Sequence, residues 1–188
     1  VKTSMVDDSN ACTILIRSNG IVSANAEISL SSDEITPPIL RGDKIVSKGF
    51  QAPQADKKLW TTLQTDGCLA FRFKWEEADP LIYLRDQDKL PDLLKPKKEG
   101  YSNLAFLLGC SNWILAGNGY MNPWVHLQTV SQNFRAVPLN TSLIAEMSIN
   151  KVFEKKGHEF VDVEVNLFDE SQNECVMTIN LIAIYKLR

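Results

Sequence analysis

The chain has 188 residues, of which 44% are hydrophobic and 23% are charged, a composition typical of globular proteins. Its net charge of −3 gives no reason to expect nucleic acid or an anionic membrane as a partner. No segment has the unbroken apolar length of a membrane span, and the first residues lack the basic-then-apolar layout of a signal peptide. We therefore expect a cytoplasmic protein.

The four cysteines are widely spaced and form no Cys-x-x-Cys pair. Each lies in an apolar run, which is typical of a small buried thiol. We therefore expect no zinc site and no other metal site. The residues are Cys12, Cys68, Cys110 and Cys175.

Residues 11–30 are predicted to form a β-hairpin, because two runs rich in Ile, Val and Leu flank Ser18-Asn19-Gly20. The proline-containing stretch 31–38 reads as a connector. We therefore divide the chain into a hairpin and linker over 1–38 and a main domain over 39–188.

The next part of the chain carries weaker signals. Arg41-Gly42-Asp43 predicts a turn before a short strand at 44–48, and 59–63 fits either a helical turn or a strand. Residues 67–75 alternate in polarity as a half-buried strand does. A charged, proline-containing surface segment follows over 76–96. Next to it lies a basic cluster that is either a solvated loop or a contact for a phosphorylated ligand: Lys95, Lys97 and Lys98.

Residues 102–116 predict one helix with no charged side chain, which must be buried on nearly every side. Ser102 is placed to cap its first turn. Gly117 and Gly119 suit a helix end that requires positive φ. Four long strands are then predicted, joined by successive hairpins into a meander that curls around the helix: 124–132, 143–153, 158–168 and 174–187.

Two stretches are more specific than the rest of the chain. One is the helix running into 118–126, NGYMNPWVH. The other is 152–161, VFEKKGHEFV, followed by a valine-rich strand and the ending IAIY at 182–185. Both stretches resemble proteins of the hotdog superfamily, including its MaoC-like and thioesterase-like bacterial members. The resemblance covers residues 100–188 and implies an α+β fold, in which a curved antiparallel sheet wraps a long central helix.

The N-terminal hairpin leaves three interpretations open. It extends the sheet of a single hotdog, or it is the remnant of a first hotdog unit in a tandem protein, or the chain starts late in a longer sequence. We favour a single hotdog domain with an N-terminal extension.

The resemblance also implies chemistry on acyl thioesters. Hotdog thioesterases usually carry Asp or Glu on the central helix, but here the nearest carboxylate is Glu99, which precedes it. MaoC-type hydratases carry an Asp and a His around an Asn-Pro pair. Asn122-Pro123 and His126 resemble that motif, but the spacing is one residue too long and Tyr120 stands where the Asp is expected. A hydratase is therefore the weakest interpretation.

His126 is the main candidate for a general base, and the alternative is a histidine that only holds the sheet or a subunit interface together. Asn112 and Asn118 either hold a water molecule or cap backbone groups, because an unpaired buried amide is costly. His158, beside a hairpin turn, is expected to be structural. The candidate substrate contacts are the helix N-terminal amides, which would polarise the thioester carbonyl, and two aromatic residues: Tyr101, Ser102, Asn103, Tyr120 and Trp124.

The sequence thus supports a thioesterase-like protein that acts on a coenzyme A or acyl-carrier-protein thioester by direct water attack. The alternative is a non-catalytic hotdog that binds acyl groups or serves in an assembly. We expect no metal or other cofactor, a role in fatty acid metabolism, and a homodimer or larger homo-oligomer.

Overall fold

A computed structural model describes residues 2–8, 11–30, 34–75 and 100–188. The chain divides into two compact units, Val1–Thr36 and Pro37–Arg188. The predictions made for 76–96, for the lysine cluster and for Glu99 fall outside the described residues.

The smaller unit is a three-stranded antiparallel sheet of β1 (Lys2–Asp8), β2 (Ala11–Ser18) and β3 (Ile21–Ser29). Asn19 and Gly20 form the two-residue turn between β2 and β3, with φ of 52° and 80°. Positive φ at both positions is the geometry of the favoured hairpin turn, and Asn-Gly tolerates it best. The predicted hairpin is therefore confirmed, while β1 was not predicted.

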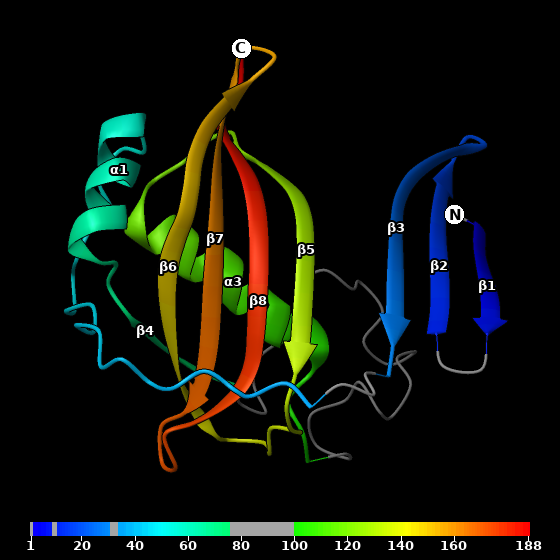
Figure 1. Ribbon diagram of the computed structural model, residues 1–188, viewed down its shortest axis with the longest axis horizontal. Helices are drawn as coiled ribbons and strands as arrows, with labels where there is room; N and C mark the ends of the chain where they lie inside the picture. Colours follow the sequence, from blue (N-terminus) through cyan, green and yellow to red (C-terminus); the bar gives the residue numbers. More distant parts are fainter. Residues whose placement is uncertain (1, 9–10, 31–33, 76–99) are drawn as a thin grey trace. The chain divides into compact units, whose positions relative to one another are not determined.

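The larger unit contains a five-stranded antiparallel sheet in the order β4-β6-β7-β8-β5 (Figure 1). The predicted hairpins joining β6, β7 and β8 are confirmed, but the predicted hairpin between β5 and β6 is wrong. β5 pairs with β8, so the chain passes from one edge of the sheet to the far side of β7 before β6 begins. The strand bounds are β4 (Phe71–Lys74), β5 (Val125–Asn133), β6 (Ser142–Lys155), β7 (His158–Asp169) and β8 (Glu174–Lys186).

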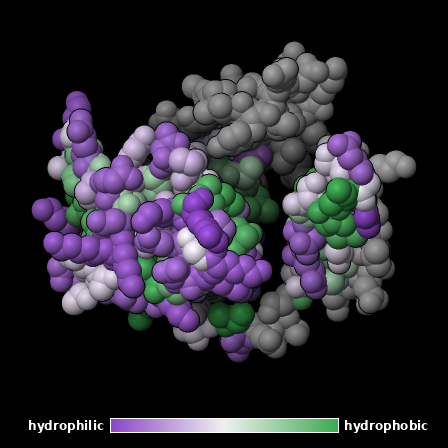
Figure 2. Space-filling model, turned by 90° about the horizontal axis from the view of Figure 1, so that it is seen from above, coloured by the Kyte–Doolittle hydropathy of each residue, from purple (hydrophilic) through white to green (hydrophobic). Residues whose placement is uncertain are grey.

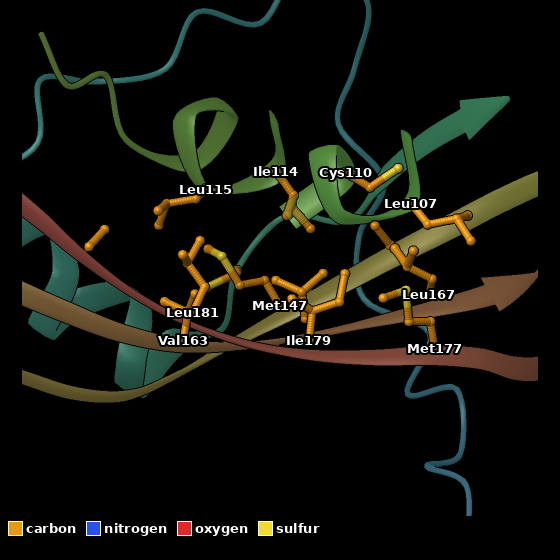
Figure 3. Packing of buried hydrophobic residues seen from close by; sticks show 14 of the residues in the cluster. Leu107, Cys110, Ile114, Leu115, Met147, Val163, Leu167, Met177, Ile179 and Leu181 are labelled. Atoms are coloured by element: carbon orange, nitrogen blue, oxygen red, sulfur yellow. The ribbon is translucent and has the colours of Figure 1, made fainter. Parts of the chain in front are cut away.

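Helix α3 (Leu104–Asn118) lies against one face of this sheet, which curves around it (Figure 1). Its buried side chains meet apolar side chains from β6, β7 and β8 in one continuous core (Figure 3). Cys110, Ile114 and Leu115 are fully buried on the helix, as are Val163 and Leu181 on the sheet. An α+β arrangement in which an antiparallel sheet wraps a central helix is therefore confirmed for residues 37–188.

The ends of α3 differ from the prediction. The N-cap is Asn103, whose Oδ1 accepts the Ala105 N–H at 2.7 Å, whereas the Ser102 N–H donates to the Val137 carbonyl. The helix runs two residues beyond the expected end, and Gly119 has an extended φ of −150° rather than a positive one. The added last turn holds Asn118, which is buried and hydrogen-bonded to the backbone of Leu69 and Ile114.

The glycines near this end serve close packing instead of a turn. A Cβ built on Gly117 would lie 2.3 Å from the Phe71 ring, and one on Gly119 would lie 2.5 Å from the Trp60 ring. Real Cβ atoms do not approach other atoms so closely, so the two rings pack directly against the helix backbone.

The segment between residue 37 and β4 contains one helix, and its pairing with other segments is limited to isolated β-bridges. Helix α1 (Lys57–Asp66) is capped by Asp56, whose Oδ1 accepts the Leu59 N–H at 2.7 Å, and it buries Trp60 completely. The open choice at 59–63 is thus settled as helix. The short strand predicted at 44–48 is reduced to a bridge between Ile45 and Ala70.

A buried carboxylate attaches the Arg41-Gly42-Asp43 turn to the face of the sheet opposite α3. Glu146 on β6 is fully buried and accepts the backbone N–H groups of Arg41, Gly42 and Asp43 at 2.8, 2.7 and 2.8 Å. The predicted turn is confirmed, with Gly42 at a φ of 83°. In Figure 1 this segment crosses the sheet on the side away from α3.

Among the residues that the structure describes, no helix is long and apolar enough to cross a membrane. The face of the larger unit seen in Figure 2 is mostly hydrophilic, with smaller hydrophobic areas between the polar side chains.

We expect Gly117→Ala to lower the free energy of unfolding by about 1–3 kcal/mol, because the added methyl group overlaps the Phe71 ring. Gly109→Ala is the matched control in the same helix, since its Cβ would meet only the half-exposed Trp113 ring at 3.2 Å. Gly109→Ala should change the free energy of unfolding little. Urea unfolding of the two variants measures the difference, and equal losses would contradict the packing role of Gly117.

Candidate functional site

A β-bulge in β5 places two polar side chains on the same face of the sheet. His126 pairs with Ala183 and Thr129 pairs with Leu181, while Leu127 between them has no partner. Ala183 and Leu181 are fully buried in the core beneath α3. Directly opposite residues in an antiparallel pair point to the same face, so His126 and Thr129 both face the helix. Without the bulge, a spacing of three residues would place them on opposite faces.

Three side chains from α3 and β5 form a hydrogen-bonded row on this face. His126 Nδ1 lies 2.9 Å from the Asn112 Oδ1, and His126 Nε2 is hydrogen-bonded to the Thr129 hydroxyl. An amide oxygen only accepts, so Nδ1 carries the proton that it donates to Asn112. In the neutral ring Nε2 is then the acceptor, and the Thr129 hydroxyl donates to it.

The Trp124 ring packs beside His126, with ring centroids 6.2 Å apart and planes inclined by 26°. Trp124 is half-buried, whereas the His126 side chain stays exposed at the edge of the sheet. Partial burial lowers the pKa of His126 from its ordinary value of 6.5. The neutral, proton-accepting form therefore predominates at pH 7, which suits a general base.

The same arrangement of three side chains occurs where a histidine takes the proton of a hydroxyl group. An orienting acceptor fixes one ring nitrogen, and the other nitrogen faces a hydroxyl. The sequence predicted roles for His126 and Asn112 but none for Thr129. A regular strand would place His126 and Thr129 on opposite faces, and no residue pattern marks the bulge at Leu127.

Asn118, the other asparagine considered, has a structural role. Its side chain is 2% exposed; Oδ1 accepts the Leu69 N–H at 2.8 Å, and Nδ2 donates to the carbonyls of Leu69 and Ile114, both at 3.0 Å. It thus ties the end of α3 to the segment before β4. Of the two predicted roles, backbone capping fits Asn118, while Asn112 contacts His126.

The expected substrate contacts at the helix N-terminus lie apart from His126. Asn112 is eight residues beyond the first residue of α3, or about 12 Å along the helix axis. Tyr101 is exposed and bridges to Pro138, Ser102 binds Val137 through its backbone, and Asn103 is the N-cap. These residues and His126 of the same chain do not form one site.

Two further candidates lie beyond the end of α3. Tyr120 is 51% exposed, and its hydroxyl accepts a weak hydrogen bond from Asn122 Nδ2 at 3.4 Å. His158 accepts the Arg188 N–H at 3.0 Å, in keeping with the structural role expected of it. Neither residue joins the row formed by His126.

The cysteines in the larger unit are buried free thiols. Burial raises the pKa of Cys68 to about 12 and also raises the pKa of Cys110, so both stay protonated. Cys12 in the smaller unit is half-buried. Within the described ranges, no group of three or more His, Cys, Asp or Glu side chains could hold a metal ion.

No family model matches the chain, and no curated protein matches it. Three solved structures that are similar to the chain are each at most 17% identical to it. An uncharacterised protein from Pyrococcus horikoshii is 17% identical, with a TM-score of 0.40, over 49% of this chain and 66% of that one. A 3R-hydroxyacyl-ACP dehydratase complex from Mycobacterium tuberculosis is 17% identical, with a TM-score of 0.39, over 45% of this chain and 62% of that one.

A mutant of a fluoroacetyl-CoA-specific thioesterase, in complex with fluoroacetate and CoA, is 12% identical, with a TM-score of 0.47, over 62% of this chain and 89% of that one. The chain spans less than two thirds of the first two proteins. Its likeness to hotdog proteins rests on its own architecture, in which a curved antiparallel sheet wraps α3.

We expect His126 to titrate below pH 6.5, because partial burial disfavours the charged ring. Asn112→Asp should raise the pKa of His126, because a carboxylate at hydrogen-bond distance from Nδ1 stabilises the imidazolium. NMR titration of the imidazole signals measures both, with His158→Ala used to assign them. An unchanged His126 midpoint in the Asn112→Asp variant would show that the two side chains are not in contact.

Proposed function

We propose that this chain is a thioesterase-like hotdog protein that hydrolyses an acyl thioester of coenzyme A or of an acyl carrier protein. One observation carries the proposal: His126 is fixed by Asn112 and presents an accepting Nε2 on the face of the sheet that meets α3. This is the arrangement that a general base requires.

In the simplest form of the reaction, water attacks the thioester carbonyl directly. His126 Nε2 takes a proton from the water as the new C–O bond forms. The tetrahedral intermediate then collapses, the C–S bond breaks, and the thiolate leaves with the proton returned by His126. Asn112 stabilises the imidazolium that forms in between, because its Oδ1 accepts the Nδ1 proton throughout.

Apolar side chains near the row support an acyl substrate. Leu104 and Leu108 follow the stripe of α3 that carries Asn112, at intervals of four residues, and Leu104 is 44% exposed. The Trp124 ring packs beside the His126 ring. A hydrocarbon chain lying along this stripe would bury exposed leucine surface while its carbonyl stays beside His126.

A second candidate function is acyl binding without catalysis, as a binding protein or an assembly subunit. The observation that favours it is the composition of α3, which contains no Asp or Glu over its whole length. The same leucine stripe would then hold the acyl group, and His126 would only help to fix β5 against the helix.

We expect the protein to release free thiol from at least one member of a panel of acyl-CoAs. His126→Ala should lower kcat by about 10²–10⁴-fold, the usual contribution of a general base. Thiol release is followed with a chromogenic disulfide reagent. Activity should rise with pH through the lowered pKa of His126 and level off near neutrality, because only the neutral ring accepts a proton.

His158→Ala is the matched control, because His126 and His158 are the two histidines of the chain. It should keep wild-type turnover. Binding of acyl-CoA without turnover would favour the second candidate function, and full activity in His126→Ala would remove His126 from the mechanism.

We also propose that the protein forms a homodimer through β5. This strand is an edge of the five-stranded sheet and has nine residues, none of them charged and none of them proline. Natural edge strands usually carry charges or prolines that prevent pairing with another chain. Val125, Leu127 and Val130 are exposed on β5 by 38%, 54% and 57%. Edge-to-edge pairing with a second copy would cover them.

We expect light scattering to give the mass of a dimer or a larger homo-oligomer, and Val130→Lys to give a monomer. A lysine at the paired edge would either lose the hydration of its ammonium group or lie close to the same lysine of the second copy. Both effects would destabilise the dimer. Thr65→Lys, on the exposed side of α1, is the control and should leave the mass unchanged. A monomeric wild-type protein at micromolar concentration would exclude this interface.

A further inference from the structure

The hydroxyl of Thr129 occupies the position where the attacking oxygen is needed. The His126 ring has one accepting nitrogen, Nε2, and the structure gives that nitrogen to the Thr129 hydroxyl. A water molecule could reach Nε2 only by displacing this hydroxyl. The oxygen that His126 is placed to deprotonate is therefore the one on Thr129.

The local backbone explains why this contact exists. Leu127 is left out of the ladder between β5 and β8, and this rotates the following residues so that Thr129 turns to the same face as His126. A bulge interrupts the hydrogen bonds of the ladder and leaves one residue unpaired, which costs stability unless other contacts offset it. Here it brings together two side chains that a regular strand would separate.

The three groups differ in how tightly they are held. Asn112 is half-buried on a helix that is anchored by its fully buried neighbours Ser111 and Ile114. His126 is exposed but fixed at both ring nitrogens. Thr129 is half-buried, and its hydroxyl has one hydrogen-bond partner among the described residues, the His126 ring. The His126 ring is thus held between a helix side chain and the Thr129 hydroxyl, and of the three residues it is the most exposed.

We propose that Thr129 is the nucleophile of the reaction, and that hydrolysis passes through an acyl ester on its Oγ1. This refines the proposed function, on which it rests, and it replaces direct water attack in the first half of the reaction. Asn112 is then the positioning residue, and His126 is the base in both halves.

In the first half, Thr129 Oγ1 attacks the thioester carbonyl while its proton passes to His126 Nε2. The C–S bond breaks, the thiolate takes that proton, and the free thiol leaves, so Thr129 carries the acyl group as an ester. In the second half, water attacks the ester carbonyl and gives its proton to Nε2. The C–O bond to Thr129 breaks, and the alkoxide recovers the proton from His126. The net change is the hydrolysis of one thioester.

The test uses the full chain and the acyl-CoA that gives the fastest thiol release. The reaction is quenched in acid during the first turnovers, and the intact mass is measured before and after peptide mapping. We expect an adduct of the acyl mass within residues 125–133, together with a burst of thiol stoichiometric with protein. Thr129→Val, which keeps the side-chain shape, should lose both the adduct and at least a hundredfold in kcat. Thr129→Ser should keep both.

Ser131→Ala is the control on the same strand, since Ser131 is exposed and both ring nitrogens of His126 are hydrogen-bonded to other residues. It should behave as wild type, and circular dichroism should show that Thr129→Val is folded.

Turnover in Thr129→Val within threefold of wild type would overturn the covalent step and leave direct water attack, and the proposed function, intact. Loss of turnover in Thr129→Val with no adduct on the wild-type protein would also overturn it and make Thr129 a positioning residue. No thiol release and no adduct with any acyl-CoA would overturn the covalent step together with the proposed function.

Discussion

The burial of α3 is the constraint on which the larger unit depends. A 15-residue helix without one charged side chain cannot remain in water, and no single strand can cover it. A strongly twisted antiparallel sheet can curve around it and bury most of its surface. The fully buried residues of β6, β7 and β8 on the helix-facing side show how this is done. Gly117 and Gly119 complete the packing by letting two aromatic rings touch the helix backbone.

The candidate site arises where this covering sheet stops. β5 is an edge strand, so most of its side chains are exposed, while those of β8 that face α3 are buried. A histidine at such an edge is close enough to the core to be fixed by a helix residue and open enough to meet a substrate. The bulge at Leu127 adds the hydroxyl of Thr129 to it. The row of Asn112, His126 and Thr129 thus follows from an edge, a bulge and a rigid helix.

α3 carries no carboxylate, and the His126 ring is held by an amide instead. The helix position that could have carried an acid near His126 holds Asn112, whose amide oxygen still fixes the ring. An amide orients the imidazole but stabilises its charged form less than a carboxylate would. Together with partial burial, this keeps the ring neutral, in agreement with its lowered pKa. The helix therefore contributes orientation to the site, and the sheet contributes the base and the hydroxyl.

Local sequence patterns determined the elements of this protein. The polarity of 102–116 determined a buried helix, alternation determined the four long strands, and Asn19-Gly20 determined the hairpin turn, because each depends on neighbours within a few residues. His126 and Asn112 were also found, since polar side chains in apolar surroundings need partners. Tertiary structure alone decided the pairing of β5 with β8, the capping of α3 by Asn103, the role of Asn118 and the place of Thr129 beside His126. These depend on ladder register and on contacts between residues far apart in the chain, and a shift of one residue in register turns a side chain to the opposite face.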